Sequence, residues 1–117
     1  MTVQECYEAI GGDYNEIMSR LHTEERIRKF VGMFLKEESY HTLVETLKEG
    51  KQEEAFRAAH TLKGVCQNLS FTALFRSSNE ITEALRAKNM DEANQLISQV
   101  TADYERTVSG VQQLLES

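Results

Sequence analysis

The chain has 117 residues and a formal net charge of −6, with 13 Lys and Arg against 19 Asp and Glu. This length provides one hydrophobic core, and the acidic balance argues against nucleic-acid binding, which normally needs a basic patch to neutralise phosphates. No apolar run is long enough to span a bilayer, and the N-terminus lacks the basic and apolar regions of a signal peptide. We therefore expect one cytoplasmic domain over residues 1–117 that binds neither nucleic acid nor membrane.

The residues with special backbone or redox properties are few. The chain contains no proline and only six glycines, which favours an all-α protein. Cys6 and Cys66 are too few for a disulfide framework and show no Cys-x-x-Cys spacing. We expect both thiols to be reduced and half-buried.

Two short helices are predicted at the N-terminus, over about residues 3–21. Thr2 with Glu5, and Asp13 with Glu16, each resemble a capping box, in which two side chains satisfy free backbone amides at a helix start. The pair of glycines at residues 11–12 separates the two helices.

The bundle core is predicted over about residues 24–116 and starts with one long helix. Thr23 is a plausible N-cap, and apolar residues then recur at helical spacing as far as Gly50, with a bend expected near residues 37–40. Gly50 suits a left-handed helix terminator.

An antiparallel helix pair is expected next, over about residues 51–69 and 71–88, because a compact domain folds such a long segment back on itself. Ser70, between the two, suits either an N-cap or a helical serine. Asn89 suits a terminator and Asp91 the N-cap of a last helix that runs nearly to the C-terminus. The sequence thus predicts an antiparallel four-helix bundle with one or two short extra N-terminal helices.

The stretch AAHTLKGVCQNL, residues 58–69, carries an unusual polar cluster inside a predicted helix. With Leu62 at the centre of the core face, His60 and Gly64 lie roughly 160° away on either side, and Gln67 and Lys63 lie roughly 140° and 100° away. The residues expected within roughly 60° of the centre are Ala55, Ala59, Cys66 and Leu69. We therefore expect His60 to point to solvent.

This cluster suits an exposed phosphoryl carrier. A neutral imidazole is a nucleophile, and a nearby cation disfavours its protonated form. Lys63, one turn after His60, can reach back and neutralise the oxygens of a transferred phosphoryl group, while Gly64 leaves space beside the ring. Each residue alone has an ordinary explanation: a solvated histidine, a solubilising lysine, a glycine for close packing. The glycine, however, faces away from the core and has no obvious packing partner.

With its flanks, this motif resembles the histidine-containing phosphotransfer (HPt) domains of two-component phosphorelay signalling. AHTLKGVCQNL, residues 59–69, matches the family's motif, and residues 30–64 resemble its run of a long helix, a glycine-containing turn and the phospho-accepting helix. The similarity covers roughly residues 24–115. One departure is Ser70, where many members carry glycine.

The resemblance implies a function and a set of roles. His60 would accept a phosphoryl group and exchange it with an aspartate of a response-regulator receiver domain or of the receiver of a hybrid histidine kinase. Lys63 would stabilise the phosphoryl charge, and Gly64 would provide access. Any magnesium would be held by the receiver, so no metal or cofactor is expected on this chain.

Three further residues are candidates for docking a receiver: Phe56, Arg57 and Gln67. Phe56 lies one turn before His60, at roughly 120° from the core centre. Packing against a neighbouring helix is the alternative role for this aromatic ring.

Other functions fit the sequence less well. It has no glycine-rich phosphate loop or kinase signature, so we expect a phosphocarrier and not an ATP-using enzyme. His22, His41 and His60 are too scattered for a helical metal site. The remaining alternative is a non-catalytic adaptor bundle, a degenerate phosphotransfer relative that acts by protein binding. The initiating methionine and the lack of a trailing linker suggest a free-standing protein, which we expect to be a monomer.

Overall fold

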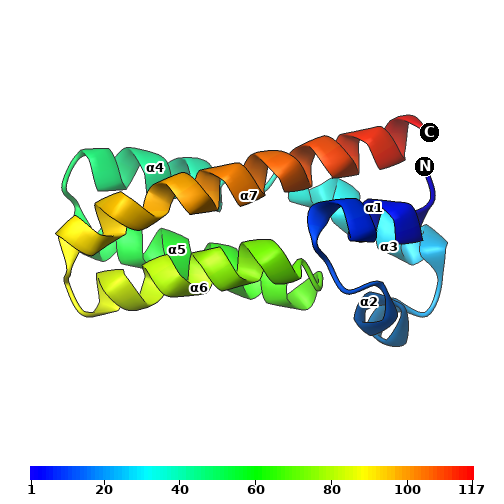
Figure 1. Ribbon diagram of the computed structural model, residues 1–117, viewed down its shortest axis with the longest axis horizontal. Helices are drawn as coiled ribbons and strands as arrows, with labels where there is room; N and C mark the ends of the chain where they lie inside the picture. Colours follow the sequence, from blue (N-terminus) through cyan, green and yellow to red (C-terminus); the bar gives the residue numbers. More distant parts are fainter.

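The protein is all-α and has no strand in the computed structural model, which describes residues 1–117 (Figure 1). None of its helices combines the length and apolar character that crossing a membrane requires. The helices, in chain order, are α1 (Val3–Ile10), α2 (Tyr14–Leu21), α3 (Glu24–Phe34), α4 (Ser39–Lys48), α5 (Gln52–Asn68), α6 (Thr72–Arg86) and α7 (Met90–Glu116).

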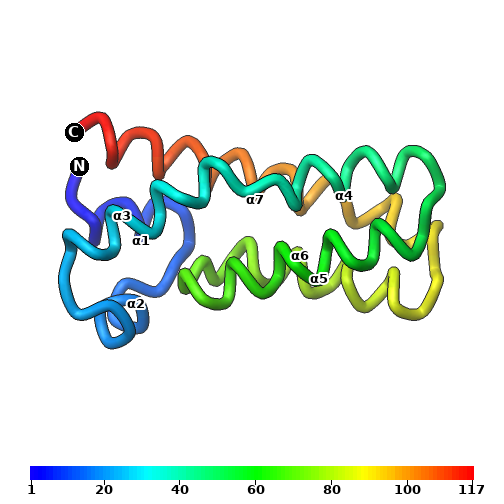
Figure 2. Tube along the Cα trace, turned by 180° about the vertical axis from the view of Figure 1, so that it is seen from behind, coloured from blue at the N-terminus to red at the C-terminus, as the bar shows by residue number.

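The long helix α7 joins the two ends of the molecule. Its N-terminal half lies beside α4 and α6, and its C-terminal half lies beside α1 and α3 (Figure 1). Helix α5 forms an antiparallel pair with α6 and packs against α4 on its other side. Seen from behind, α3 and α4 follow one another along the same side of the bundle (Figure 2). The chain ends meet, since the Met1 amino group donates to Ser117 Oγ at 3.1 Å. The predicted helical bundle with short extra N-terminal helices is therefore confirmed.

The predicted long helix of residues 24–50 is in fact two helices, and the interruption is larger than a bend. The backbone amides of Leu35, Lys36 and Glu37 each bond to the carbonyl three residues earlier, which tightens the chain and ends α3. The Glu37 carboxylate then accepts from the Ser39 amide at 2.7 Å. This bond satisfies one of the free amides at the start of α4, and the break falls at residues 35–38.

One of the two predicted capping boxes is complete. Thr2 Oγ1 accepts from the Glu5 amide at 3.1 Å, and the Thr2 amide donates to Glu5 Oε1 at 2.8 Å. Asp13 caps α2 by accepting from the Glu16 amide, but the Glu16 carboxylate does not return the bond. It accepts from Ser70 Oγ at 2.7 Å instead, so this side chain links α2 to the α5–α6 turn.

Two helix ends differ in how well they were predicted. Gly50 has φ +72° and closes α4 as expected. The prediction that Asn89 ends α6 and Asp91 caps α7 is wrong by one to two residues. Lys88 takes the left-handed conformation, with φ +60°, and Asn89 is the N-cap, accepting from the Glu92 amide at 3.1 Å.

Ser70 is neither an N-cap nor a helical residue, as its φ of +57° places it in the left-handed region that favours glycine. Its carbonyl accepts from the Asp13 amide at 2.9 Å, and the Ala73 amide donates to the Gly11 carbonyl at 3.0 Å. Tyr7 OH adds a 2.8 Å bond to the Leu69 carbonyl. These hydrogen bonds hold the N-terminal helices against the turn that follows α5.

The core is one continuous apolar cluster, to which every helix contributes. Cys6 and Cys66 belong to it and are fully buried, so the prediction of half-buried thiols is wrong, although both are free. Cys6 Sγ donates to the Gly110 carbonyl at 3.4 Å. Burial raises the pKa of the Cys66 thiol, because the interior disfavours the thiolate, and we expect this thiol to stay protonated at neutral pH.

Candidate functional site

Helix α5 buries one face and exposes the other, as its sequence pattern predicts. Leu62 is fully buried, and His60 is exposed. The buried residues of α5 are Ala55, Ala58, Ala59, Leu62 and Cys66. The helix starts after the Gly50 turn, with Glu53 and Glu54 in its first turn, where negative charge complements the helix dipole.

The His60 imidazole is free of hydrogen bonds within the chain, and the space one turn further along the helix is empty. A Cβ built on Gly64 would meet no atom within 4 Å outside the local helix. Gly64 is therefore no packing glycine, because no neighbouring element approaches it. The two residues together leave an open approach to the ring.

Lys63 is partly exposed and lies on the same helix, one turn after His60. Its ammonium group makes no hydrogen bond and no ion pair within the chain. Most other ion pairs of this protein join residues three or four positions apart on one helix, but Lys63 has no such partner. The charge is thus available to an anion that arrives from outside.

Phe56 is the only aromatic ring in contact with His60. The two ring centroids lie 6.0 Å apart with an interplanar angle of 24°, which is a near-parallel stack. The guanidinium carbon of Arg86, at the end of α6, lies 5.0 Å from the Phe56 centroid. Phe56 is partly buried and also packs against the core. Its neighbours therefore include the histidine, a cation and the apolar interior.

Arg57 and Gln67 lie at opposite ends of the exposed strip of α5. This strip consists of Arg57, His60, Lys63, Gly64 and Gln67, which are partly or fully exposed. Arg57 is exposed and pairs with Glu53, one turn earlier, at 3.1 Å. Gln67 has an exposed side chain, and its carbonyl accepts a hydrogen bond from the Arg20 guanidinium of α2. The structure thus brings α2 close to the C-terminal end of the strip, which sequence reasoning did not predict.

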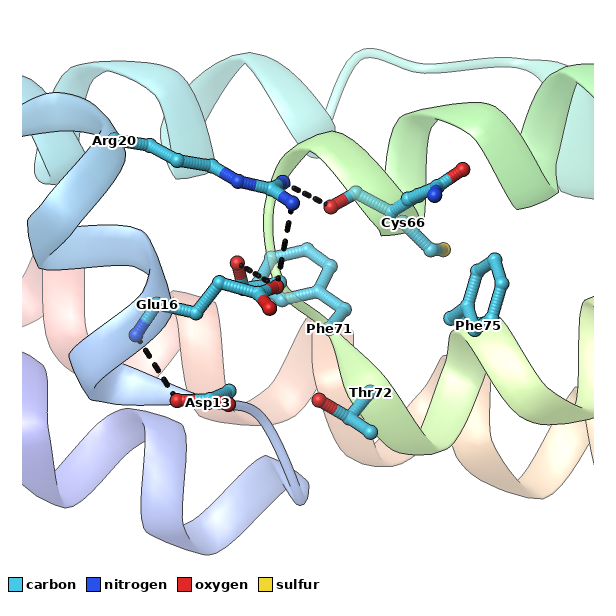
Figure 3. Close-up of a pocket in the computed structure, with 9 residues that line it drawn as sticks. Asp13, Glu16, Arg20, Cys66, Phe71, Thr72 and Phe75 are labelled. Atoms are coloured by element: carbon cyan, nitrogen blue, oxygen red, sulfur yellow. Dashed lines mark hydrogen bonds and ion pairs between the residues drawn. The ribbon is translucent and has the colours of Figure 1, made fainter.

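Clefts border α5 near this strip. The first, next to the start of α4, is mostly polar and includes Arg57 and Thr61. The second is apolar and lies between α2, α3 and α5, and its apolar lining residues are Leu21, Phe30, Met33, Phe34, Val65 and Leu69. The third lies at the α5–α6 turn, where Arg20 and Glu16 of α2 cover the end of α5 (Figure 3).

The other two histidines lie apart from this face. His22 ends α2 with φ +71°, and His41 lies on α4, where its ring meets Tyr40 and Tyr104 edge-on. No group of three or more His, Cys, Asp and Glu side chains is arranged to hold a metal ion.

This arrangement can present a nucleophilic ring nitrogen to a large partner. The ring is exposed, its approach is open, and one unpaired cation lies a turn away. The residue that sequence reasoning missed is Arg86. Its contact with Phe56 depends on the register between α5 and α6, and no periodicity within one helix reveals that register.

Comparison with family models gives a match over most of the bundle. A family model described as "Hpt domain" matches residues 30–110, which is more than half of the chain. Searches of curated proteins and of solved structures gave no match to this chain.

Proposed function

Because the chain belongs to the Hpt domain family of phosphorelay signalling, we propose that it is a phosphocarrier whose His60 exchanges a phosphoryl group with an aspartate of a receiver domain. Hpt domains are phosphotransfer domains that interact with receivers and contain no kinase domain. The family match begins at residue 30, so it leaves out α1, α2 and the first half of α3. These helices share the continuous core, which supports one domain over residues 1–117.

The observation that carries the proposal is the state of the His60 ring. The ring is exposed and lies one turn before Gly64, where an added Cβ would meet no atom and the glycine has no packing role. A receiver is a folded domain, so it needs such clearance to bring its aspartyl phosphate to the ring.

The proposed step conserves all atoms and electrons. The lone pair of one His60 ring nitrogen attacks the phosphorus of the receiver's aspartyl phosphate, and a nitrogen–phosphorus bond forms. The bond between phosphorus and the aspartate oxygen breaks, and its electron pair leaves with the carboxylate. The proton on the second ring nitrogen stays there. The reverse reaction returns the group to a receiver.

Two neighbours support this chemistry. Phosphoryl transfer depends mainly on positioning and on stabilisation of the charge on the phosphoryl oxygens. Lys63 has an ammonium group without a partner in the chain, and from one turn after His60 it can lean back toward the ring, as helical side chains do. Gly64 keeps the approach open. We propose Arg57 and Gln67 as receiver contacts at the two ends of the strip.

The test is a transfer assay with a panel of purified, phosphorylated receiver domains. We expect at least one receiver to label the protein in an acid-labile, alkali-resistant form, as a phosphohistidine requires. His60→Gln should remove the label completely. His41→Gln is the matched control, since His41 is also an exposed helical histidine, and it should keep the label.

Two results would count against the proposal. A label that persists in His60→Gln would place the phosphoryl group on another residue. A wild-type protein that no receiver labels, but that still binds a receiver, would favour the adaptor function.

A further inference from the structure

The Phe56 ring joins His60 to a cation on the neighbouring helix. Its centroid lies 6.0 Å from that of the His60 ring, with 24° between the planes, and 5.0 Å from the guanidinium carbon of Arg86. Phe56 and His60 are one turn apart on α5, whereas Arg86 is the last residue of α6. The three side chains therefore couple the exposed strip of α5 to α6.

This stack is the one specific contact that restrains the His60 side chain. The ring is exposed and has no hydrogen bond within the chain, so no other side-chain contact selects among the rotamers that the helix backbone allows. Near-parallel, offset stacking is a favourable arrangement of aromatic rings. It favours those rotamers in which the imidazole lies along the Phe56 ring.

Phe56 is itself held from two sides. Its ring packs partly into the core, and the Arg86 guanidinium lies over it in a cation–π contact. Arg86 Nε also donates to Glu83 Oε2 at 3.2 Å, which limits the movement of the guanidinium. A fixed Phe56 ring is a better support for the histidine than a mobile one.

We propose, on the basis of the proposed phosphotransfer function, that Phe56 is a positioning residue that orients the His60 ring, and that Arg86 keeps Phe56 in place. Transfer needs the ring nitrogen and the phosphorus at close distance and in line, and a ring that is already oriented loses less freedom on reaching that geometry. The contribution should therefore affect the rate of transfer within the complex with the receiver, and not the affinity for the receiver.

The first experiment needs no receiver. We would record aromatic NMR spectra of the free protein and follow the His60 ring protons at a pH where the imidazole is neutral. Phe56→Leu should move these resonances toward the positions of an unstacked histidine, and Arg86→Gln should move them part of the way. Thermal unfolding checks that both variants fold. Unchanged His60 resonances in folded Phe56→Leu would overturn the proposal.

The second experiment uses the receiver that labels the wild-type protein, in single-turnover transfer at increasing receiver concentrations. Phe56→Leu should lower the rate at saturating receiver by about 3- to 10-fold, the size expected for one side chain that must be ordered during the reaction. Phe56→Tyr should keep the stack and the rate. Arg86→Gln should have a smaller effect, and Arg86→Lys should restore much of it, because lysine also binds aromatic faces.

The matched control is Arg26→Gln, since Arg26 is an exposed arginine on α3 whose side chain makes no ion pair in the chain. It should leave the saturating rate unchanged. If Phe56→Leu raises only the receiver concentration needed for half-maximal rate, Phe56 is a docking residue and the positioning role is wrong.

The two proposals fail in different ways. If no receiver labels the wild-type protein, the phosphocarrier function fails, and the NMR spectra alone decide whether Phe56 orients His60. If the wild type is labelled on His60 while Phe56→Leu keeps both its spectrum and its saturating rate, only the positioning role is lost.

Discussion

Gly64 and Gly110 both lie in the interior of a helix, where glycine costs about 1 kcal/mol relative to alanine, but for opposite physical reasons. A Cβ on Gly110 of α7 would overlap Cγ2 of Ile10, which is buried on α1. A Cβ on Gly64 of α5 would meet no atom within 4 Å. Gly110 allows two helices of this chain to approach closely, and Gly64 leaves space that nothing in the chain fills.

The difference separates a residue needed for the fold from one that the fold does not need. The Gly110 carbonyl also accepts from the Cys6 thiol, so α1 and α7 are tied together at this position. Gly64 has a conformational cost without any such compensation within the chain. An unexplained cost on the exposed face beside His60 is what a site for an external partner would produce.

The largest effect on the free energy of unfolding is expected from Gly110→Ala. The added methyl group would collide with a β-branched, buried side chain that has little freedom to move, and overpacking of this kind costs about 1–3 kcal/mol. The higher helix propensity of alanine offsets up to about 1 kcal/mol. We expect a net loss of about 1–2 kcal/mol in the free energy of unfolding, measured by urea denaturation.

Ile10→Val in the Gly110→Ala background would not relieve this collision, because valine keeps a methyl group at the same position. Ile10→Ala should relieve it, so the two substitutions should be less harmful together than the sum of their separate effects. Strict additivity would show that α1 does not approach α7 as described.

Gly64→Ala should do the opposite. Alanine should raise the free energy of unfolding by about 0.5–1 kcal/mol, since it improves helix propensity and meets nothing. The same substitution should slow phosphoryl transfer from a receiver, and Gly64→Gln should slow it further, because the larger side chain narrows the approach to His60.

Gly32→Ala is the control for this comparison. Gly32 lies within α3, and its Cβ would be 3.5 Å from Leu115 Cδ1, an ordinary contact. The variant should gain similar stability and leave the transfer rate unchanged. If the Gly64→Ala protein is stabilised but transfers the phosphoryl group at the wild-type rate, Gly64 is not needed for access to His60.

How much of the fold and of the candidate site could be predicted from the sequence depends on whether a feature is local to one helix. The outward direction of His60 and Gly64 follows from the angle per residue of a single helix, and the structure confirms it. The role of Gly110 could not be predicted, because its partner Ile10 lies one hundred residues away and only the packing of α1 on α7 brings them together.

The same distinction explains the errors. The break at residues 35–38 has no proline or glycine to announce it, and its only sequence signal is the run of polar residues at 36–39, which interrupts the apolar pattern between α3 and α4. Arg86 reaches Phe56 from another helix, so its place in the candidate site depends on interhelical register. Ser70 and Lys88 adopt left-handed backbones, although neither side chain favours that conformation.

Ser70 and Lys88 also provide the smallest predicted effects, at two positions where glycine is absent but would suit the backbone. Glycine relieves the strain of a positive φ, but part of the gain is lost because the unfolded chain becomes more flexible. Lys88 is exposed and its side chain makes no hydrogen bond or ion pair, so Lys88→Gly should raise the free energy of unfolding by roughly 0.3–0.5 kcal/mol.

Ser70 differs from Lys88 in that its side chain is bonded. Ser70 Oγ donates to Glu16 Oε1 at 2.7 Å, and the loss of this hydrogen bond should cost about 1 kcal/mol. Ser70→Gly should therefore be neutral or slightly destabilising. Equal stabilisation of both variants in urea denaturation would mean that the Ser70–Glu16 bond contributes nothing to holding α2 against the end of α5.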